Sequence, residues 1–151
     1  MRLQRLPRPG AYIGTNRYFI TINVRDRQLL FTDRQLVETC QAQVQFAGDA
    51  TAFRMMADCY MPDHLHLILE GLTGGSDFCR CMKQIKQRTS FHAIRFGVGR
   101  LWQEGFHDRI IRHDEDLWAY VEYMLQNPVR AGLVQRAEDY PYTRVLFTRG
   151  P

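Results

Sequence analysis

The chain has 151 residues, of which 45% are apolar or aromatic, and it carries a formal net charge of +4. This length and composition suit one domain over residues 1–151 with an adequate core and require no disordered segment. The sequence has no apolar run long enough to cross a bilayer, and its amino terminus lacks the apolar segment of a signal peptide, so we expect a cytoplasmic protein.

The hydrophobic pattern predicts strands and helices in an order typical of an α+β fold. In chain order these are a strand at 17–24, a helix at 33–46 after a Thr32 cap, strands at 52–60 and 64–70 joined by a tight turn, a helix from a Ser76 cap to about 96, a short hairpin of 101–104 and 107–112, and a helix that starts near 114. Asp114 or Asp116 can cap the last helix, and Pro128 must end it. Two strand-helix-strand halves with antiparallel pairing predict a ferredoxin-like α+β sandwich.

The most informative motif is His64-Leu65-His66 in the second of the paired strands. Because a strand points alternate side chains to the same face, both imidazoles should project together, with Leu65, Leu67 and Leu69 on the other face. Two imidazoles on a rigid strand can chelate one divalent cation and leave positions open for a substrate oxygen. A solvated strand face explains the same spacing equally well, so the motif alone does not decide between the two interpretations.

A second group of polar side chains lies in the last predicted helix. Tyr123 and Asn127 are four residues apart, so a helix places the phenol and the amide on one face. Pro128 makes the last turn irregular and leaves the direction of Asn127 open, so Gln126 is an alternative ligand. Tyr120 competes for the role of nucleophile, and an aromatic residue on an amphipathic helix is most often a core residue.

Taken together, these segments resemble the single-tyrosine HUH transposases, a family that includes the REP-associated tyrosine transposases. The resemblance covers most of the chain and runs in the family's order through residues 18–23, 61–66, 101–112 and 123–134. It implies the HUH nuclease fold, an antiparallel sheet with helices packed over one face. It also implies a single-stranded DNA endonuclease and strand transferase that acts on hairpin or palindromic DNA.

The resemblance assigns a role to each of the four polar residues. It makes His64, His66 and Asn127 the ligands of a divalent metal, Mg²⁺ or Mn²⁺, and Tyr123 the nucleophile that forms a 5′-phosphotyrosine. Many relatives have asparagine where Asp63 stands, and a carboxylate at this position either tightens metal binding or caps the preceding turn. The residue types suit this chemistry, because a metal can polarise a phosphodiester and a phenolate can displace a 3′-hydroxyl.

Arginine makes up nearly all of the basic content, and arginine pairs bidentately with phosphate and with guanine edges. Near the proposed site, Arg112 and Arg130 flank the tyrosine helix and are the preferred DNA-binding residues, with Arg109 beside them. A solvated helix face is the alternative for any one basic residue taken alone. Further candidate patches are Arg80, Lys83 and Lys86 on the predicted helix, and Arg2, Arg5 and Arg8 at the amino terminus.

Other interpretations remain open at this point. The chain can be a catalytically silent DNA-binding or regulatory protein of the same fold, or an RNA-binding module that uses Tyr18 and Phe19, and it can act as a monomer or a homodimer. A structural zinc site at Cys79 and Cys81 with the two histidines is a further alternative, although Cys-x-Cys is not the usual knuckle spacing. In a cytoplasmic protein the four cysteines should stay reduced.

Overall fold

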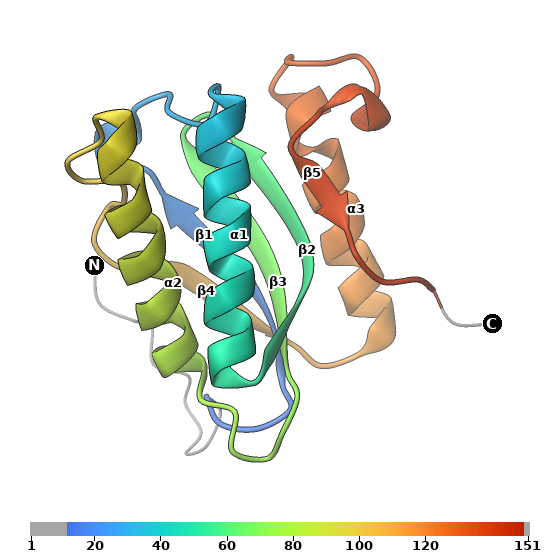
Figure 1. Cartoon of the computed structure of the whole chain (residues 1–151). Coiled ribbons are helices and arrows are strands. Elements are labelled where there is room, and N and C mark those ends of the chain that lie inside the picture. Colours follow the sequence, from blue (N-terminus) through green and yellow to red (C-terminus); the bar gives the residue numbers. More distant parts are fainter. Residues whose placement is uncertain (1–11, 150–151) are drawn as a thin grey trace.

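The computed structural model describes residues 12–149, so the basic patch at Arg2, Arg5 and Arg8 lies outside the described residues. Within these residues the structure contains five strands and three α-helices (Figure 1). They are β1 (Arg17–Asn23), α1 (Arg34–Thr51), β2 (Phe53–Met61), β3 (His64–Gly71), α2 (Phe78–Ala93), β4 (His107–Ile111), α3 (Asp114–Arg130) and β5 (Thr143–Val145). Three short 3₁₀ helices lie between them, η1 (Arg25–Arg27), η2 (Ile94–Phe96) and η3 (Ala137–Asp139). Within residues 12–149, no helix combines the length and the apolar character that a membrane span needs.

The strands form one antiparallel sheet in the order β4-β1-β3-β2-β5. The first four strands in this order have the ferredoxin-like arrangement that the sequence predicts. In the register of the central pair, Thr21 of β1 lies opposite His66 of β3, and Asn23 lies opposite His64. The histidine motif therefore occupies the middle of the sheet, where both neighbouring strands hold its backbone in place.

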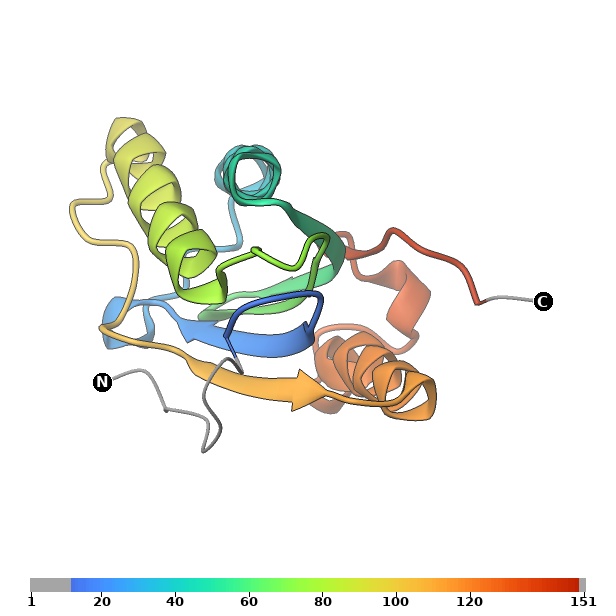
Figure 2. The same cartoon turned by 90° about the horizontal axis from the view of Figure 1, so that it is seen from below.

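Helices cover both faces of this sheet. The helices α1 and α2 lie side by side over one face, against a core that includes Tyr18 and Ile20 of β1 (Figure 2). On the opposite face α3 packs its apolar side against Phe19 of β1 and Ile68 of β3. The sequence predicted that the helices would pack over one face of the sheet. This is correct for α1 and α2, whereas α3 lies on the opposite face. The physical reason is that β1 and β3 carry large apolar side chains on both faces, so both faces need a cover.

Aspartates, rather than the expected Thr32 and Ser76, cap the first two helices. The carboxylate of Asp33 accepts from the first free main-chain N–H groups of α1, and Asp77 does the same for α2. The Ser76 hydroxyl instead donates to the main-chain oxygen of Ala52 at 2.7 Å and accepts from the loop before it. Each predicted cap was therefore wrong by one residue. Both helices were predicted, although α1 extends to Thr51, beyond the expected end at residue 46.

The third helix continues beyond the point where proline was expected to end it. Pro128 lies inside α3, which extends to Arg130. A proline near the end of a helix removes only one main-chain hydrogen bond, and later bonds, from Ala131 N–H to the Asn127 oxygen among them, keep the last turn closed. Neither Asp114 nor Asp116 caps the start, because the N-cap residue is His113, without a side-chain bond.

The segment before β4 differs from the prediction. Residues 101–104 do not form the predicted hairpin strand, and Trp102 makes only an isolated bridge to Val24. The buried indole N–H of Trp102 donates to Thr89 of α2 at 2.8 Å, so tertiary packing sets this segment. After α3, the chain returns to the sheet, where β5 pairs with β2 and the Tyr140 hydroxyl donates to the main-chain oxygen of Tyr60.

Candidate active site

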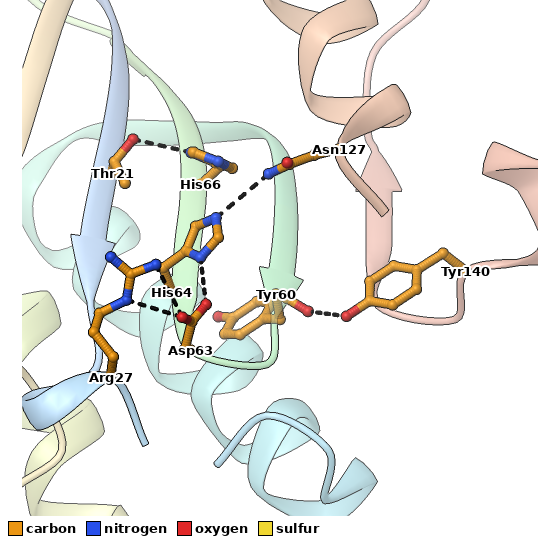
Figure 3. Close-up of polar contacts among 8 residues, drawn as sticks. All are labelled: Thr21, Arg27, Tyr60, Asp63, His64, His66, Asn127 and Tyr140. Atoms are coloured by element: carbon orange, nitrogen blue, oxygen red, sulfur yellow. Dashed lines mark hydrogen bonds and ion pairs between the residues drawn. The ribbon is translucent and has the colours of Figure 1, made fainter. Parts of the chain in front are cut away.

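The two histidines of the motif lie on the sheet face that α3 covers. Figure 3 shows both rings on this face, and their centroids are 4.8 Å apart. Leu65, Leu67 and Leu69 alternate with them along β3, point to the other face and are fully buried. The alternation predicted from the sequence is therefore confirmed. A solvated strand face does not explain the pair, because His66 is only 5% exposed. The two adjacent imidazoles are therefore both largely buried between the sheet and α3.

His66 is held as a neutral ring. Its Nδ1 lies 2.9 Å from the hydroxyl oxygen of Thr21 on the neighbouring strand. Burial lowers the pKa of His66 to about 3, and the nearby charges of His64 and Arg130 act in the same direction. At neutral pH the ring is uncharged, so one nitrogen keeps an electron pair that a cation can accept.

His64 is oriented from both sides. Its Nδ1 lies 2.7 Å from a carboxylate oxygen of Asp63, and its Nε2 lies 3.4 Å from the side-chain nitrogen of Asn127 on α3. Burial alone raises the pKa of Asp63, but hydrogen bonds from His64 and Arg27 outweigh it, so the pKa lies below its usual value. Asp63 is therefore a carboxylate that accepts hydrogen bonds from His64 and Arg27.

The helix α3 brings Asn127, rather than Gln126, to the histidines. Asn127 is half-buried and directed at His64, whereas the Gln126 amide donates to Glu122 one turn earlier on the helix at 3.3 Å. Rotation of the Asn127 amide by half a turn would exchange its oxygen and nitrogen, which ordinary hydrogen-bond geometry does not distinguish. Asn127 is thus a third possible ligand, which can direct its amide oxygen toward the two histidines.

Tyr123 lies one helical turn before Asn127 on the same face of α3. Its side chain is 51% exposed, and its ring stands edge-on to His66 with centroids 6.1 Å apart. Tyr120, the competing tyrosine, is half-buried and stacks on Phe19 at 4.8 Å. The accessible phenol next to the histidines is therefore that of Tyr123, and Tyr120 packs α3 against the sheet.

The donor set of this site fits a divalent cation. Two imidazoles and one amide oxygen are ligands that Mn²⁺ and related ions accept, with further positions left for water or phosphate oxygen. Within residues 12–149, no group of three or more His, Cys, Asp or Glu side chains could hold a metal. A three-ligand site at the two histidines therefore needs the Asn127 amide as its third ligand. The alternative zinc site is wrong, because Cys79 and Cys81 lie on α2, across the sheet from His64 and His66.

Comparisons with known proteins identify the family. The chain is 32% identical over 134 residues to the REP-associated tyrosine transposase of Escherichia coli K12, covering 87% of this chain and 78% of that protein. The chain belongs to the REP-associated tyrosine transposase family. A candidate family member from Haemophilus influenzae is 28% identical over 138 residues, which cover 83% of this chain and 77% of that one. No protein-family model matches the sequence.

A solved structure agrees with this membership. It is a REP-associated tyrosine transposase bound to a REP hairpin, and it superposes with a TM-score of 0.78 at 27% identity, covering 93% of this chain and 82% of that chain. The present chain is accordingly a DNA-processing enzyme of the tyrosine transposase class, with an α+β fold built on an antiparallel sheet. The resemblance on which the sequence interpretation rested is thereby confirmed.

The structure separates four of the five predicted DNA-binding residues of this transposase into two groups. Arg112 lines a cavity of about 480 Å³ beside Tyr120 and Tyr123, and Arg109 lines a smaller one, of about 200 Å³, on the edge strand β4. Arg80 and Lys83 are exposed on α2, on the sheet face opposite the histidines. Arg109 and Arg112 therefore lie on the same side of the sheet as α3, and Arg112 shares a cavity with Tyr123.

Arg130 occupies an unexpected position in this site. Its guanidinium carbon lies 4.3 Å from the centroid of the Tyr123 ring, and one of its N–H groups donates to the Tyr123 main-chain oxygen at 2.8 Å. A cation over an aromatic face is attracted by the ring quadrupole. The residue that the sequence places at the end of the tyrosine helix thus contacts the tyrosine itself.

Three other groups differ from their sequence interpretation or were missed by it. Lys86 is bound to the main-chain oxygens of Gln103 and Gly105 at 3.0 and 2.8 Å, so it holds a loop. Tyr18 and Phe19 are buried, which removes the stacking surface that an RNA-binding module would need. The contact of Thr21 with His66 was not predicted, although the alternation along β1 could have placed Thr21 on the polar face of its strand.

Proposed function

We propose that this transposase is a metal-dependent single-stranded DNA endonuclease and strand transferase that acts through a covalent 5′-phosphotyrosine. The observation that carries the proposal is the convergence of Tyr123 and Asn127 from α3 with His64 and His66 from β3 over one face of the sheet. All four side chains come from one chain. In this proposal residues 1–151 form one domain, and the site works within a single protomer, whether the protein is a monomer or a homodimer.

In this proposal His64, His66 and Asn127 hold a divalent cation, Mn²⁺ or Mg²⁺, which supplies charge neutralisation at a phosphate oxygen. The buried, neutral state of His66 keeps its electron pair available, and the Asp63 carboxylate orients His64. The low exposure of both rings excludes bulk water from one side of the site. The exposed side, next to Tyr123, remains open to DNA.

Tyr123 would carry the covalent step. Its hydroxyl oxygen forms a bond to the phosphorus of the scissile phosphodiester, and the bond from phosphorus to the 3′-oxygen breaks. The phenol gives up one proton and the departing 3′-oxygen takes up one, so the step neither consumes water nor needs a nucleotide cofactor. The phosphotyrosine keeps the energy of the broken bond, which allows the same phosphate to pass to another 3′-hydroxyl.

The proposed substrate is hairpin or palindromic DNA. The solved family member is bound to a REP hairpin, and it shares 27% identity and most of its fold with this chain. Arg112 lines the cavity beside Tyr123, and Arg109 lines a neighbouring one on β4, so both can pair with phosphates of a strand that enters the site from this side. Arg80 and Lys83, on the other face, can contact a hairpin only where it extends past the edge of the sheet.

The experiment that tests this function is covalent capture of DNA. The protein is mixed with a labelled single-stranded hairpin oligonucleotide and Mn²⁺ or Mg²⁺ and then separated on a denaturing gel. We expect a metal-dependent protein–DNA band that is lost in Tyr123→Phe and kept in Tyr120→Phe, the matched control one turn away on the same helix. Hairpin binding without any adduct across varied palindromes would instead support the catalytically silent DNA-binding alternative.

A further inference from the structure

One charged group beside the histidines belongs neither to the ligand set nor to the DNA path. Asp63 lies in the tight turn between β2 and β3, directly before His64. One of its carboxylate oxygens is 2.7 Å from His64 Nδ1, and the other is 2.9 Å from Arg27 (Figure 3). Arg27, Asp63 and His64 therefore form a continuous chain of charge-assisted hydrogen bonds that ends at the site.

The loop that carries Arg27 is built to reach this carboxylate. Asp26 and Arg27 both have φ near 53°, a left-handed conformation that residues other than glycine rarely adopt. Two main-chain bonds join this loop to the turn, from Val24 N–H to the Asp63 oxygen at 2.9 Å and from Phe31 N–H to the Pro62 oxygen at 3.0 Å. Strained backbone that persists next to a functional site indicates that the surrounding contacts enforce it.

The hydrogen bonds define which nitrogen of His64 carries the proton when the ring holds only one. A carboxylate only accepts, so the ring must donate from Nδ1 to Asp63. The other nitrogen, Nε2, is then left with its electron pair, and Nε2 is the atom that faces Asn127. In a free imidazole both tautomers exist, so a fixed acceptor at Nδ1 removes one of them.

We propose that Asp63, held in place by Arg27, is a positioning residue that fixes the Nδ1–H tautomer and the ring orientation of His64, so that Nε2 is presented to a divalent cation. The inference rests on the proposed metal-dependent function. It assigns to the Arg27 loop, which lies outside the four-residue set, a part in metal affinity. Outer carboxylates of this kind typically change metal affinity by roughly 10-fold to 100-fold.

The chain contains a matched control for this arrangement. Arg54 and Glu70 form an ion pair with the same 2.9 Å separation on neighbouring strands, away from the histidines. Its side-chain exposures, 50% and 24%, nearly equal those of Arg27 and Asp63, 56% and 25%. The variants Arg54→Met and Glu70→Gln thus remove a comparable ion pair without touching His64.

The test compares Asp63→Ala, Asp63→Asn and Arg27→Met with these two controls by two measurements. The first is the His64 tautomer in the metal-free protein, from multiple-bond ¹H–¹⁵N NMR spectra, and the second is the affinity for Mn²⁺ alone by calorimetry. We expect Asp63→Ala to populate the Nε2–H tautomer and to lose roughly 10-fold to 100-fold in Mn²⁺ affinity. Asp63→Asn keeps an acceptor oxygen, so it should retain the tautomer, and Arg27→Met should fall between wild type and Asp63→Ala.

Defined results would overturn the inference. These are a wild-type tautomer in Asp63→Ala with an affinity within twofold of Glu70→Gln, or a wild-type protein that binds no Mn²⁺. If Asp63→Ala does not fold, Arg27→Met decides, and a tautomer and affinity equal to those of Arg54→Met would refute the role. Both measurements need no DNA, so a missing covalent adduct would count against the proposed function and leave this inference standing.

Discussion

Arg130 offers a direct test of how the tyrosine is prepared for attack. Its two contacts with Tyr123, over the ring and to the main-chain oxygen, tie it to the group that would react. A cation over an exposed aromatic ring contributes about 0.5–1 kcal/mol, and a solvent-exposed hydrogen bond adds a similar amount. Together they amount to about 1–2 kcal/mol, or roughly a 5-fold to 30-fold effect on a rate.

We therefore expect Arg130→Met to lower the single-turnover rate of adduct formation at saturating DNA by roughly 5-fold to 30-fold. The affinity for the hairpin and its dependence on salt should change little, because the guanidinium is engaged with Tyr123. The assay combines quenched-flow gels with binding titrations at several salt concentrations. Arg136→Met, at an exposed arginine paired with Asp139 after α3, serves as the control and should match wild type in both measurements.

The opposite pattern would refute this reasoning. If Arg130→Met weakens hairpin binding and lowers the salt slope by about one, while the rate at saturation stays at the wild-type value, Arg130 binds a phosphate. That result would support the DNA-binding role that the sequence predicted for Arg130. Arg112→Met provides the reference for this behaviour, since Arg112 lines the cavity beside Tyr123.

Three further predictions concern the ligands and the core. Asn127→Ala should reduce adduct formation at least roughly 10-fold in the gel assay, because Asn127 approaches His64. Gln126→Ala should not reduce it, since Gln126 bonds Glu122 instead. Equal losses in the two variants would contradict this assignment. Adduct formation should stop on chelation and return at lower concentrations of Mn²⁺ than of Mg²⁺, since imidazole ligands suit Mg²⁺ poorly; a preference for Mg²⁺ in the same titration would argue against two histidine ligands. Arg144→Met should lower the free energy of unfolding by about 3 kcal/mol at pH 8, because it leaves the fully buried Asp58 unpaired. Burial raises the folded-state pKa of Asp58 above its unfolded value, so the folded state holds the proton more tightly. The loss of unfolding free energy in Arg144→Met should therefore shrink as the pH falls from 8 to 5. Urea titrations in which the difference from wild type does not change with pH would exclude this explanation.

Local pattern was enough to predict part of this site. Alternation along β3 placed His64 and His66 on one face, and the spacing of four placed Tyr123 and Asn127 on one side of α3. The meeting of the two pairs depends on which sheet face α3 covers. Because β1 carries apolar side chains on both faces, the sequence pattern allows either choice, and the face became visible only in the structure.

The contact between Arg27 and Asp63 was beyond sequence reasoning for a different reason. Left-handed backbone is expected at glycine or asparagine, and here Asp26 and Arg27 adopt it instead. The two cap positions at Asp33 and Asp77 were missed by one residue because neighbouring Thr32 and Ser76 are also good caps. Such near-equivalent local choices are settled by tertiary contacts, as the bonds of Ser76 to the loop before it show.

The path of α3 has a consequence for how the enzyme can evolve and be engineered. The helix starts after β4 at one edge of the sheet and leads, through 131–142, to β5 at the other edge, so both of its ends are tied to the sheet. A residue inserted within α3 before Tyr123 would rotate the rest of the helix by about 100°. Such an insertion would turn Tyr123 and Asn127 away from the histidines while leaving the sheet intact. The rotational register of α3 is therefore part of the active site, although most of the helix takes no part in the chemistry.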